Sequence, residues 1–168
     1  MILRRFAPAD WRGVHRYMSD PDVTAFLPEG LMTPAQARTF AVRNAKKPHA
    51  IAVIEKAGGE LVGHMPFHPW FVAATWEIGW ALARDRHGLG YATEAAAALV
   101  AHAFDALGCH RVIATCQPEN RASWRIAEKL QMRREAHFRS CLLQPDGTWW
   151  DEYFYAILAD EWRGPKGV

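Results

Sequence analysis

The sequence predicts one mixed α/β domain over residues 1–168. Runs of β-type apolar residues alternate with longer runs at helical spacing, in the order β, α, α, β, β, β, α, β, α, β, β. No repeat, low-complexity segment or linker interrupts this order. A strand–helix–strand unit near the middle favours parallel pairing of its two strands.

The first half begins with a strand and two helices. Residues 2–6 form a short strand, and Pro8 suits the first turn of a helix that residues 20–23 end. A second helix begins after the cap residue Thr33, with Pro34 at its first position, and reaches about residue 46. Two apolar runs then flank a hairpin turn at residues 56–60, which contains Gly58 and Gly59.

The second half predicts a third β-type run over residues 75–83, a glycine turn and an alanine-rich helix that reaches about residue 108. A buried strand follows at residues 110–117 and a helix at 119–130. Two last strands, 132–143 and 148–158, are joined by a turn at 144–147. The strand–helix–strand unit is the part between residues 75 and 117.

Composition excludes several classes of protein. The net charge of +2 and the lack of a basic stripe argue against nucleic-acid binding. Three cysteines without a CxxC motif predict neither a disulfide framework nor a zinc site, and we expect no metal. We expect no signal peptide and no membrane span, and therefore a cytoplasmic protein. The eight tryptophans favour core packing over an aromatic-lined cleft.

The glycine turn before the alanine-rich helix has a chemical interpretation. The first N–H groups of a helix lack intrahelical partners, and the helix dipole places partial positive charge there. Gly88 and Gly90 let an anion approach bare backbone, which suits a phosphate, and Arg84, Arg86 and His87 add positive charge nearby. The alternative is a tight turn with close helix packing. A P-loop and a Rossmann motif are both absent.

Ordered motifs then carry a resemblance. The segment RHGLGYATEA resembles the diphosphate-binding motif of the GNAT acyl-CoA N-acyltransferases, and more closely that of their RimJ/RimL-like branch. The segments DPDV, WEIGWALARD, NRASWRIAEKLQM and WWDEYFYAIL followed by EW resemble other parts of that branch, in order and over nearly the whole chain. His87 stands where the motif usually has Gln or Arg.

The resemblance implies a GNAT fold: a central, mostly antiparallel seven-stranded sheet with a splay between strands 4 and 5, flanked by about four helices. It also implies acetyl-CoA as co-substrate. Backbone of the strand before the loop would pair with the pantetheine arm, at Trp80, Ala81, Leu82 and Ala83. Backbone N–H groups of the loop would hold the diphosphate, at His87, Gly88, Leu89, Gly90, Tyr91, Ala92 and Thr93. Asn120 would contact the pantetheine and Ser123 would lie near the sulfur, although both residue types also cap helices.

The implied reaction is direct attack of an amine on the thioester. At pH 7 a lysine amine needs about 4–5 kcal/mol to lose its proton, and an α-amine only about 1 kcal/mol. Glu77 is the leading candidate for the general base, with a structural strand carboxylate as the alternative. Ser123 is the candidate partner of the leaving thiolate. Tyr153 is the candidate proton donor, and Tyr155 is the alternative because strand alternation alone does not choose between them.

Two histidines and four aromatic residues are further candidates for the acceptor site. His64 and His68 are spaced like a metal pair, but Pro66 and Pro69 exclude a helix and an extended segment separates them by about 13 Å. They are expected either to line a substrate pocket or to lie on a surface strand. Four aromatic residues are candidates for the wall of the acceptor site: Trp70, Phe71, Trp149 and Trp150. We expect at least half of these four to pack in the core instead.

We therefore expect an N-acetyltransferase that uses acetyl-CoA. The acceptor is a primary amine, either a protein N-terminus such as that of a ribosomal protein or a small molecule. Acidic residues near the expected site are sparse, which gives no preference for polyamines. The resemblance also implies a homodimer as one oligomeric state. The rival interpretation is a non-catalytic CoA-binding or regulatory module.

Overall fold

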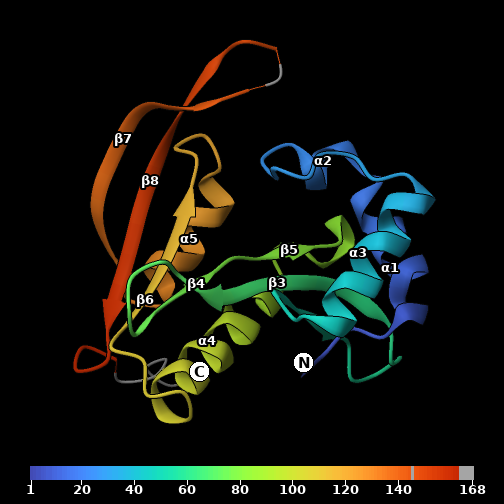
Figure 1. Cartoon of the computed structure of the whole chain (residues 1–168), viewed down its shortest axis with the longest axis horizontal. Helices are drawn as coiled ribbons and strands as arrows, with labels where there is room; N and C mark the ends of the chain where they lie inside the picture. Colours follow the sequence, from blue (N-terminus) through green and yellow to red (C-terminus); the bar gives the residue numbers. More distant parts are fainter. Residues whose placement is uncertain (145, 163–168) are drawn as a thin grey trace. The chain divides into compact units, whose positions relative to one another are not determined.

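The computed structural model describes residues 1–144 and 146–162, which fall into two compact units. The first unit comprises Met1–His68 and Gly79–Ala96, and the second comprises Pro69–Ile78 and Ala97–Val168. Figure 1 shows the elements of both units along the chain. The division follows contacts within the chain, and the single-domain assignment stays a prediction.

The first unit is built on an antiparallel sheet. Its strands are β1 (Ile2–Arg4), β2 (Ala50–Ile54), β3 (Leu61–Pro69) and β5 (Ala81–Leu82), paired in that order. The predicted hairpin turn between β2 and β3 is confirmed, and the Gly59 N–H donates to the Glu55 carbonyl at 3.0 Å. Gly63 is required where β5 crosses β3, because a Cβ there would lie 2.3 Å from the Ala81 carbonyl oxygen.

Three helices belong to the first unit. They are α1 (Trp11–Met18), after a 3-10 turn at Pro8–Asp10, α2 (Pro21–Thr24) and α3 (Pro34–Lys46). The predicted cap of α3 is confirmed, since Thr33 Oγ1 accepts from the Gln36 N–H at 3.3 Å. Residues 20–23 do more than end the first helix: the Asp20 carboxylate accepts from the Asp22 N–H at 2.9 Å and starts α2.

A hydrophobic core joins these helices to the sheet. The helices contribute buried residues at helical spacing, and the strands contribute alternate residues. The cluster contains Phe6, Val14, Tyr17, Met18, Met32, Ala37, Phe40, Ala50, Ala52, Ile54, Leu61 and Ala83. It fixes the sheet that carries β5 and thus the strand that precedes the glycine turn.

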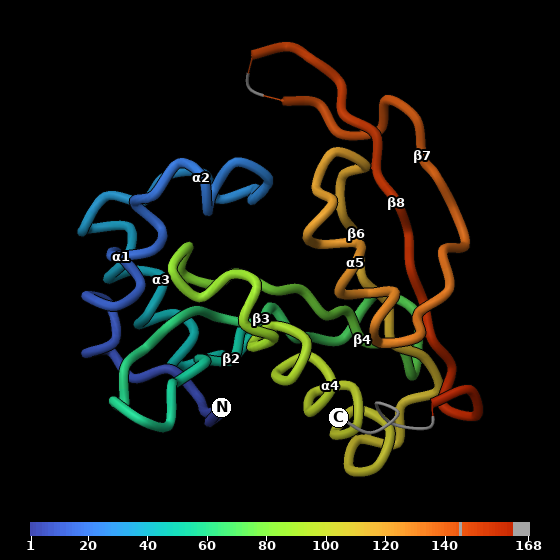
Figure 2. Tube along the Cα trace, turned by 180° about the vertical axis from the view of Figure 1, so that it is seen from behind, coloured from blue at the N-terminus to red at the C-terminus, as the bar shows by residue number. Residues whose placement is uncertain are grey.

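The second unit contains four strands of the eight-stranded sheet. Strand β4 (Thr75–Ile78) is parallel to β6 (Arg111–Cys116), which confirms the predicted parallel unit. Strand β6 pairs antiparallel with β8 (Trp149–Leu158), and β8 pairs with β7 (Arg133–Leu143). Figures 1 and 2 show the β7–β8 ribbon extending past the end of β6. Residue 145, in the predicted turn at 144–147, lies outside the described residues.

Two helices complete the order of elements. Helix α4 (Tyr91–Asp105) follows a second 3-10 turn at Arg84–Arg86, and α5 (Arg121–Lys129) follows β6. Helix α4 begins within the first unit and ends within the second. One face of α4 is buried, at Ala95, Ala96, Leu99, Val100 and Ala103.

The prediction of one continuous strand over residues 75–83 is wrong. It is split at Gly79 and Trp80, because β4 pairs with β6 whereas β5 pairs with β3. With this split and the additional helix α2, the described residues contain eight strands and five α-helices, where the sequence predicted seven and about four. Pairing of β4 with β6 ends at Glu77 and Ile113, although β6 continues to Cys116.

Candidate functional site

The glycine turn before α4 has the backbone of an anion-binding loop. Gly88 and Gly90 have φ of 76° and 82°, which favour glycine over residues with a Cβ. A Cβ built on either glycine would meet no atom within 4 Å, so close helix packing does not explain these glycines. The turn conformation requires them, and the space beside them is open.

Backbone donors gather at this turn. The His87 N–H donates to the Arg84 carbonyl at 3.1 Å, and the Glu94 N–H donates to the Gly90 carbonyl at 3.0 Å. Between them, the N–H groups of residues 88–93 have no protein acceptor within the described part of the chain. They lie at the N-terminus of α4, where the helix dipole favours negative charge. This arrangement fits a diphosphate group.

The positive charge expected beside the turn is already paired, which corrects the sequence interpretation. Arg84 forms an ion pair with Asp22. Arg86 contacts Asp85 at 2.7 Å, Glu55 at 3.3 Å and Glu60 at 3.4 Å. Because carboxylates pair with both guanidinium groups, an anion at this loop would be held mainly by backbone donors.

Strand β5 presents one backbone edge away from β3. Gly79 and Ala83 donate their N–H groups to the Pro66 and Val62 carbonyls, at 2.9 and 2.8 Å. Alternation along the strand therefore directs the backbone groups of Trp80 and Leu82 away from β3. The imidazole of His87 bonds to the Leu82 carbonyl at 2.9 Å. Of the four residues predicted to pair with pantetheine, Trp80 and Leu82 have the suitable orientation.

Asn120 and Ser123 begin helix α5. The Asn120 side chain accepts from the Ser123 N–H at 3.1 Å, so its capping role is present in the structure. Ser123 is buried, and its hydroxyl is hydrogen-bonded to the Cys116 side chain at the end of β6. Burial raises the pKa of Cys116 to about 11, and the bond from Ser123 opposes that rise. The neighbouring thiol is thus neutral near pH 7.

Glu77 has a second carboxylate as its neighbour. Glu77 lies on β4 opposite Ile113 of β6, and Glu152 lies on β8 with its side chain hydrogen-bonded to Thr115 of β6. The pKa of Glu152 is raised, first by burial and then by the negative charge of Glu77, while the Thr115 bond lowers it. The sequence does not predict this pair of carboxylates, because the pairing of β8 with β6 joins positions far apart in the chain.

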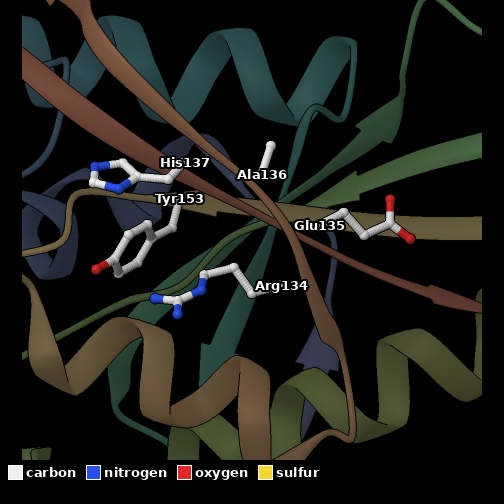
Figure 3. Close-up of a pocket in the computed structure, with 5 residues that line it drawn as sticks. All are labelled: Arg134, Glu135, Ala136, His137 and Tyr153. Carbon is white, nitrogen blue, oxygen red and sulfur yellow. The ribbon is translucent and has the colours of Figure 1, made fainter.

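Tyr153 and Tyr155 share one face of β8 but differ in surroundings. Tyr155 is buried, its hydroxyl lies 3.5 Å from Glu128, and its pKa is raised to about 12, chiefly by burial. Tyr153 lines a shallow pocket with Arg134, Glu135, Ala136 and His137. Figure 3 shows its ring between His137 and Arg134, whose guanidinium carbon is 4.4 Å from the ring centroid. Tyr153 is therefore the accessible one of the two phenols.

The sheet separates these groups onto two faces. Tyr153 lies opposite Cys116, and Glu77 lies opposite Ile113, three residues earlier on β6. Because successive side chains alternate, Glu77, Thr115 and Glu152 share one face. Tyr153 and Cys116, with Ser123 bonded to Cys116, occupy the other.

The tryptophans do not form the core, which corrects the packing prediction. None of the eight is buried: Trp149 is exposed and the other seven are half-buried. Phe71 is 85% exposed, so none of the four proposed acceptor-site aromatics packs in the core. The ring of Trp70 packs at a tilt against Phe71 and Phe154, with ring centroids 4.0 and 5.7 Å apart. Phe154 shares the face of Glu152, so aromatic surface accompanies the two carboxylates.

His64 lies neither in a substrate pocket nor on a surface strand, which were its two expected positions. It is 1% exposed on β3, and its Nδ1 lies 2.8 Å from the Tyr17 hydroxyl. Burial lowers its pKa to about 4, so it is neutral near pH 7. His68 instead faces His49, with ring centroids 5.8 Å apart.

Over residues 1–144 and 146–162, no helix combines the length and apolar character needed to cross a bilayer. Over the same residues, no three side chains of His, Cys, Asp or Glu form a group that could hold a metal ion.

Comparison with known proteins identifies the family. The family model described as an acetyltransferase (GNAT) domain matches residues 1–133. The uncharacterised N-acetyltransferase YnaD of Bacillus subtilis is 42% identical over 165 residues, which cover 97% of this chain and 96% of that protein.

Solved structures share the fold. A GNAT-family acetyltransferase from Bacillus anthracis superposes with a TM-score of 0.91 at 44% identity, covering 95% of each chain. A spermidine N-acetyltransferase from Vibrio cholerae, solved with CoA and spermine, has a TM-score of 0.81 at 16% identity over 95% of this chain and 96% of that one. The second likeness concerns the fold alone. The chain belongs to the GNAT family of N-acetyltransferases and is an acyltransferase with that family's mixed α/β fold and open sheet.

Proposed function

We propose that this enzyme transfers an acetyl group from acetyl-CoA to a primary amine by direct attack in a ternary complex. The observation that carries the proposal is the row of backbone N–H groups at residues 88–93, at the start of α4, in a chain of the GNAT family. These donors and the two positive-φ glycines would hold the diphosphate. Trp80 and Leu82 supply a strand edge for the pantetheine, with Asn120 and Ser123 as further proposed contacts.

Pairing of β4 with β6 ends at Glu77 and Ile113 although β6 continues to Cys116, so the thioester would lie beyond that pair, beside β6, where side chains from both faces of the sheet reach it. The amine nitrogen bonds to the acetyl carbon, the carbon–sulfur bond breaks, and its electron pair goes to sulfur. Glu77 accepts the proton that the amine loses. On the other face, the Ser123 hydroxyl hydrogen-bonds the thiolate and Tyr153 supplies its proton.

The carboxylate face favours a cationic acceptor. Glu77 and Glu152 provide negative charge, and the half-buried Trp70 and Phe154 add aromatic surface beside it. A protonated amine is attracted by both kinds of group. A protein N-terminus, such as that of a ribosomal protein, and a small amine both fit this chemistry. The RimJ/RimL-like branch, a cytoplasmic location and a homodimer are parts of the same proposal and rest on the sequence.

The test is acetyl-CoA turnover against a panel of amines. The panel contains peptides with free N-termini, polyamines and small monoamines, with product acetylation followed by mass spectrometry. Glu77→Gln should lower kcat/KM by roughly 100-fold, within the usual range for loss of a general base. Ser123→Ala should lower kcat with a smaller effect on the KM of the amine. The non-catalytic alternative predicts tight CoA binding without acetylation of any acceptor.

A further inference from the structure

One carboxylate in the first unit reaches both ends of the glycine turn. Glu55 directly follows β2, and its Oε2 accepts from Arg86 Nη2 at 3.3 Å. Its Oε1 accepts from the Tyr91 hydroxyl at 3.1 Å. Arg86 ends the 3-10 turn before the loop, and Tyr91 is the first residue of α4. We propose that Glu55 is a positioning residue that fixes the diphosphate loop, residues 87–90, from both ends.

The bonds of Glu55 lie in a partly enclosed setting. The side chains of Arg86 and Glu55 are 20% and 21% exposed, so water screens this pair less than a fully exposed one. Glu60 and Asp85 hold the same guanidinium from other directions, at 3.4 and 2.7 Å. Neither Glu60 nor Asp85 bonds to α4. Among these three carboxylates, Glu55 alone does so, through the Tyr91 hydroxyl. Glu55 therefore couples the β2–β3 turn to the helix start.

The loop needs such a restraint because of its sequence. Gly88 and Gly90 confer a wide range of backbone conformations, and ordering them on ligand binding costs conformational entropy. A loop whose ends are already fixed loses less entropy on binding, which raises affinity.

This inference rests on the proposed use of acetyl-CoA, and binding measurements separate the two. Calorimetry with coenzyme A should give a Kd about tenfold weaker for Glu55→Gln, which corresponds to about 1.4 kcal/mol. Tyr91→Phe removes only the hydroxyl and should weaken binding by about threefold. The double variant should bind much as Glu55→Gln does, because both changes break the same link. Failure of the wild-type protein to bind coenzyme A would contradict the proposed function itself.

Glu60→Gln is the matched control. Glu60 contacts the same Arg86 and also Arg16, but neither residue lies on α4. Its coenzyme A affinity should equal that of the wild type. A Glu60→Gln protein that loses as much affinity as Glu55→Gln would overturn the proposal, because the effect would then follow the charge around Arg86.

A second donor distinguishes positioning of the loop from general damage. S-acetylpantetheine lacks the diphosphate, so its kcat/KM should be the same in Glu55→Gln and the wild type. The kcat/KM of acetyl-CoA should fall by about tenfold in the variant. Equal losses with both donors, or coenzyme A binding by Glu55→Gln at wild-type affinity, would overturn the role of Glu55. Thermal unfolding of each variant confirms that the protein compared is folded.

Discussion

Gly88 and Gly90 illustrate how single residues shape the candidate site. Their positive φ values turn the chain from β5 into α4 and leave backbone donors uncovered. Glu77 acts at the same scale, since its negative charge raises the pKa of Glu152. These effects depend on one dihedral angle or one carboxylate, so single substitutions test them.

Gly90→Ala should affect both stability and binding. A Cβ at φ of 82° costs about 1–2 kcal/mol of unfolding free energy, and relaxation of the turn would misplace the donors. We expect weaker coenzyme A binding by calorimetry and a lower midpoint of urea unfolding. Gly58→Ala is the control, because Gly58 lies in another turn with open space and without a positive φ. Equal behaviour of the two variants would contradict the role of the Gly90 conformation.

Glu77→Gln should lower the pKa of Glu152. The charge of Glu77 opposes ionisation of Glu152, so its removal makes ionisation easier, although burial continues to raise the pKa. NMR titration of the glutamate side-chain carbons measures this directly. Glu128→Gln serves as control, because Glu128 lies on α5 near Tyr155, on the other face of the sheet. An unchanged Glu152 pKa in Glu77→Gln would show that the two carboxylates are not coupled.

At the scale of elements, polar contacts join helices to strands. The Tyr17–His64 bond links α1 to β3 inside an apolar core, and the Asn120 cap orders the first turn of α5 at the end of β6. Each contact fixes where an element starts or packs. Its loss should therefore change the stability of an element as well as the state of one side chain.

The His64 contact predicts a pH dependence of stability. The pKa of His64 is about 4 in the folded protein and about 6.5 when unfolded, so the unfolded chain binds more protons between these values. The contribution of His64 to the free energy of unfolding is fully present above pH 6.5. It falls by on the order of 3 kcal/mol as the pH approaches 4. Urea unfolding across this range measures the slope. His64→Phe should reduce it; an unchanged slope would assign the dependence to other groups.

Asn120 variants separate capping from cofactor contact. Asn120→Ala should cost about 1 kcal/mol of unfolding free energy, because the Ser123 N–H loses its acceptor. Asn120→Asp keeps an acceptor and should keep the stability, while removing the amide that would contact pantetheine. Weaker coenzyme A binding by a stable Asn120→Asp protein supports the contact. Wild-type binding by that variant would leave Asn120 with capping alone.

At the scale of the whole molecule, cysteine exposure determines how turnover is assayed. Cys109 and Cys116 are buried, Cys141 is exposed, and all three are free thiols. The pKa of Cys141 is also raised, first by desolvation and then by Glu152, which slows its reaction near neutral pH. A thiol reagent used to follow coenzyme A release would therefore also react slowly with Cys141 and add to the signal.

Thiol titration should show one accessible cysteine in the native protein. We expect Cys141 to react before unfolding, and Cys109 and Cys116 to react only after denaturation. Cys141→Ser should abolish the native signal and provide a clean background for the turnover assay. Rapid reaction of a second thiol in the Cys141→Ser protein would contradict the burial of Cys109 and Cys116.

The sequence alone determined the local features of this protein. Thr33 and Pro34 specify the start of α3, Gly58 and Gly59 specify a hairpin turn, and Gly88 and Gly90 specify the turn that leads into α4. Each depends on residues close together in the chain, where dihedral preference and capping act. The ordered motifs also indicated the family, which the comparisons confirmed.

Only the tertiary structure decided which distant residues meet. Strand register brings Glu152 toward Glu77, separates both from Tyr153, and divides the predicted strand at residues 75–83 into β4 and β5. Packing placed His64 in the core and left every tryptophan outside it. Glu55 reaches Arg86 and Tyr91 for the same reason. These outcomes depend on pairing and burial between segments far apart in sequence, which local preference does not encode.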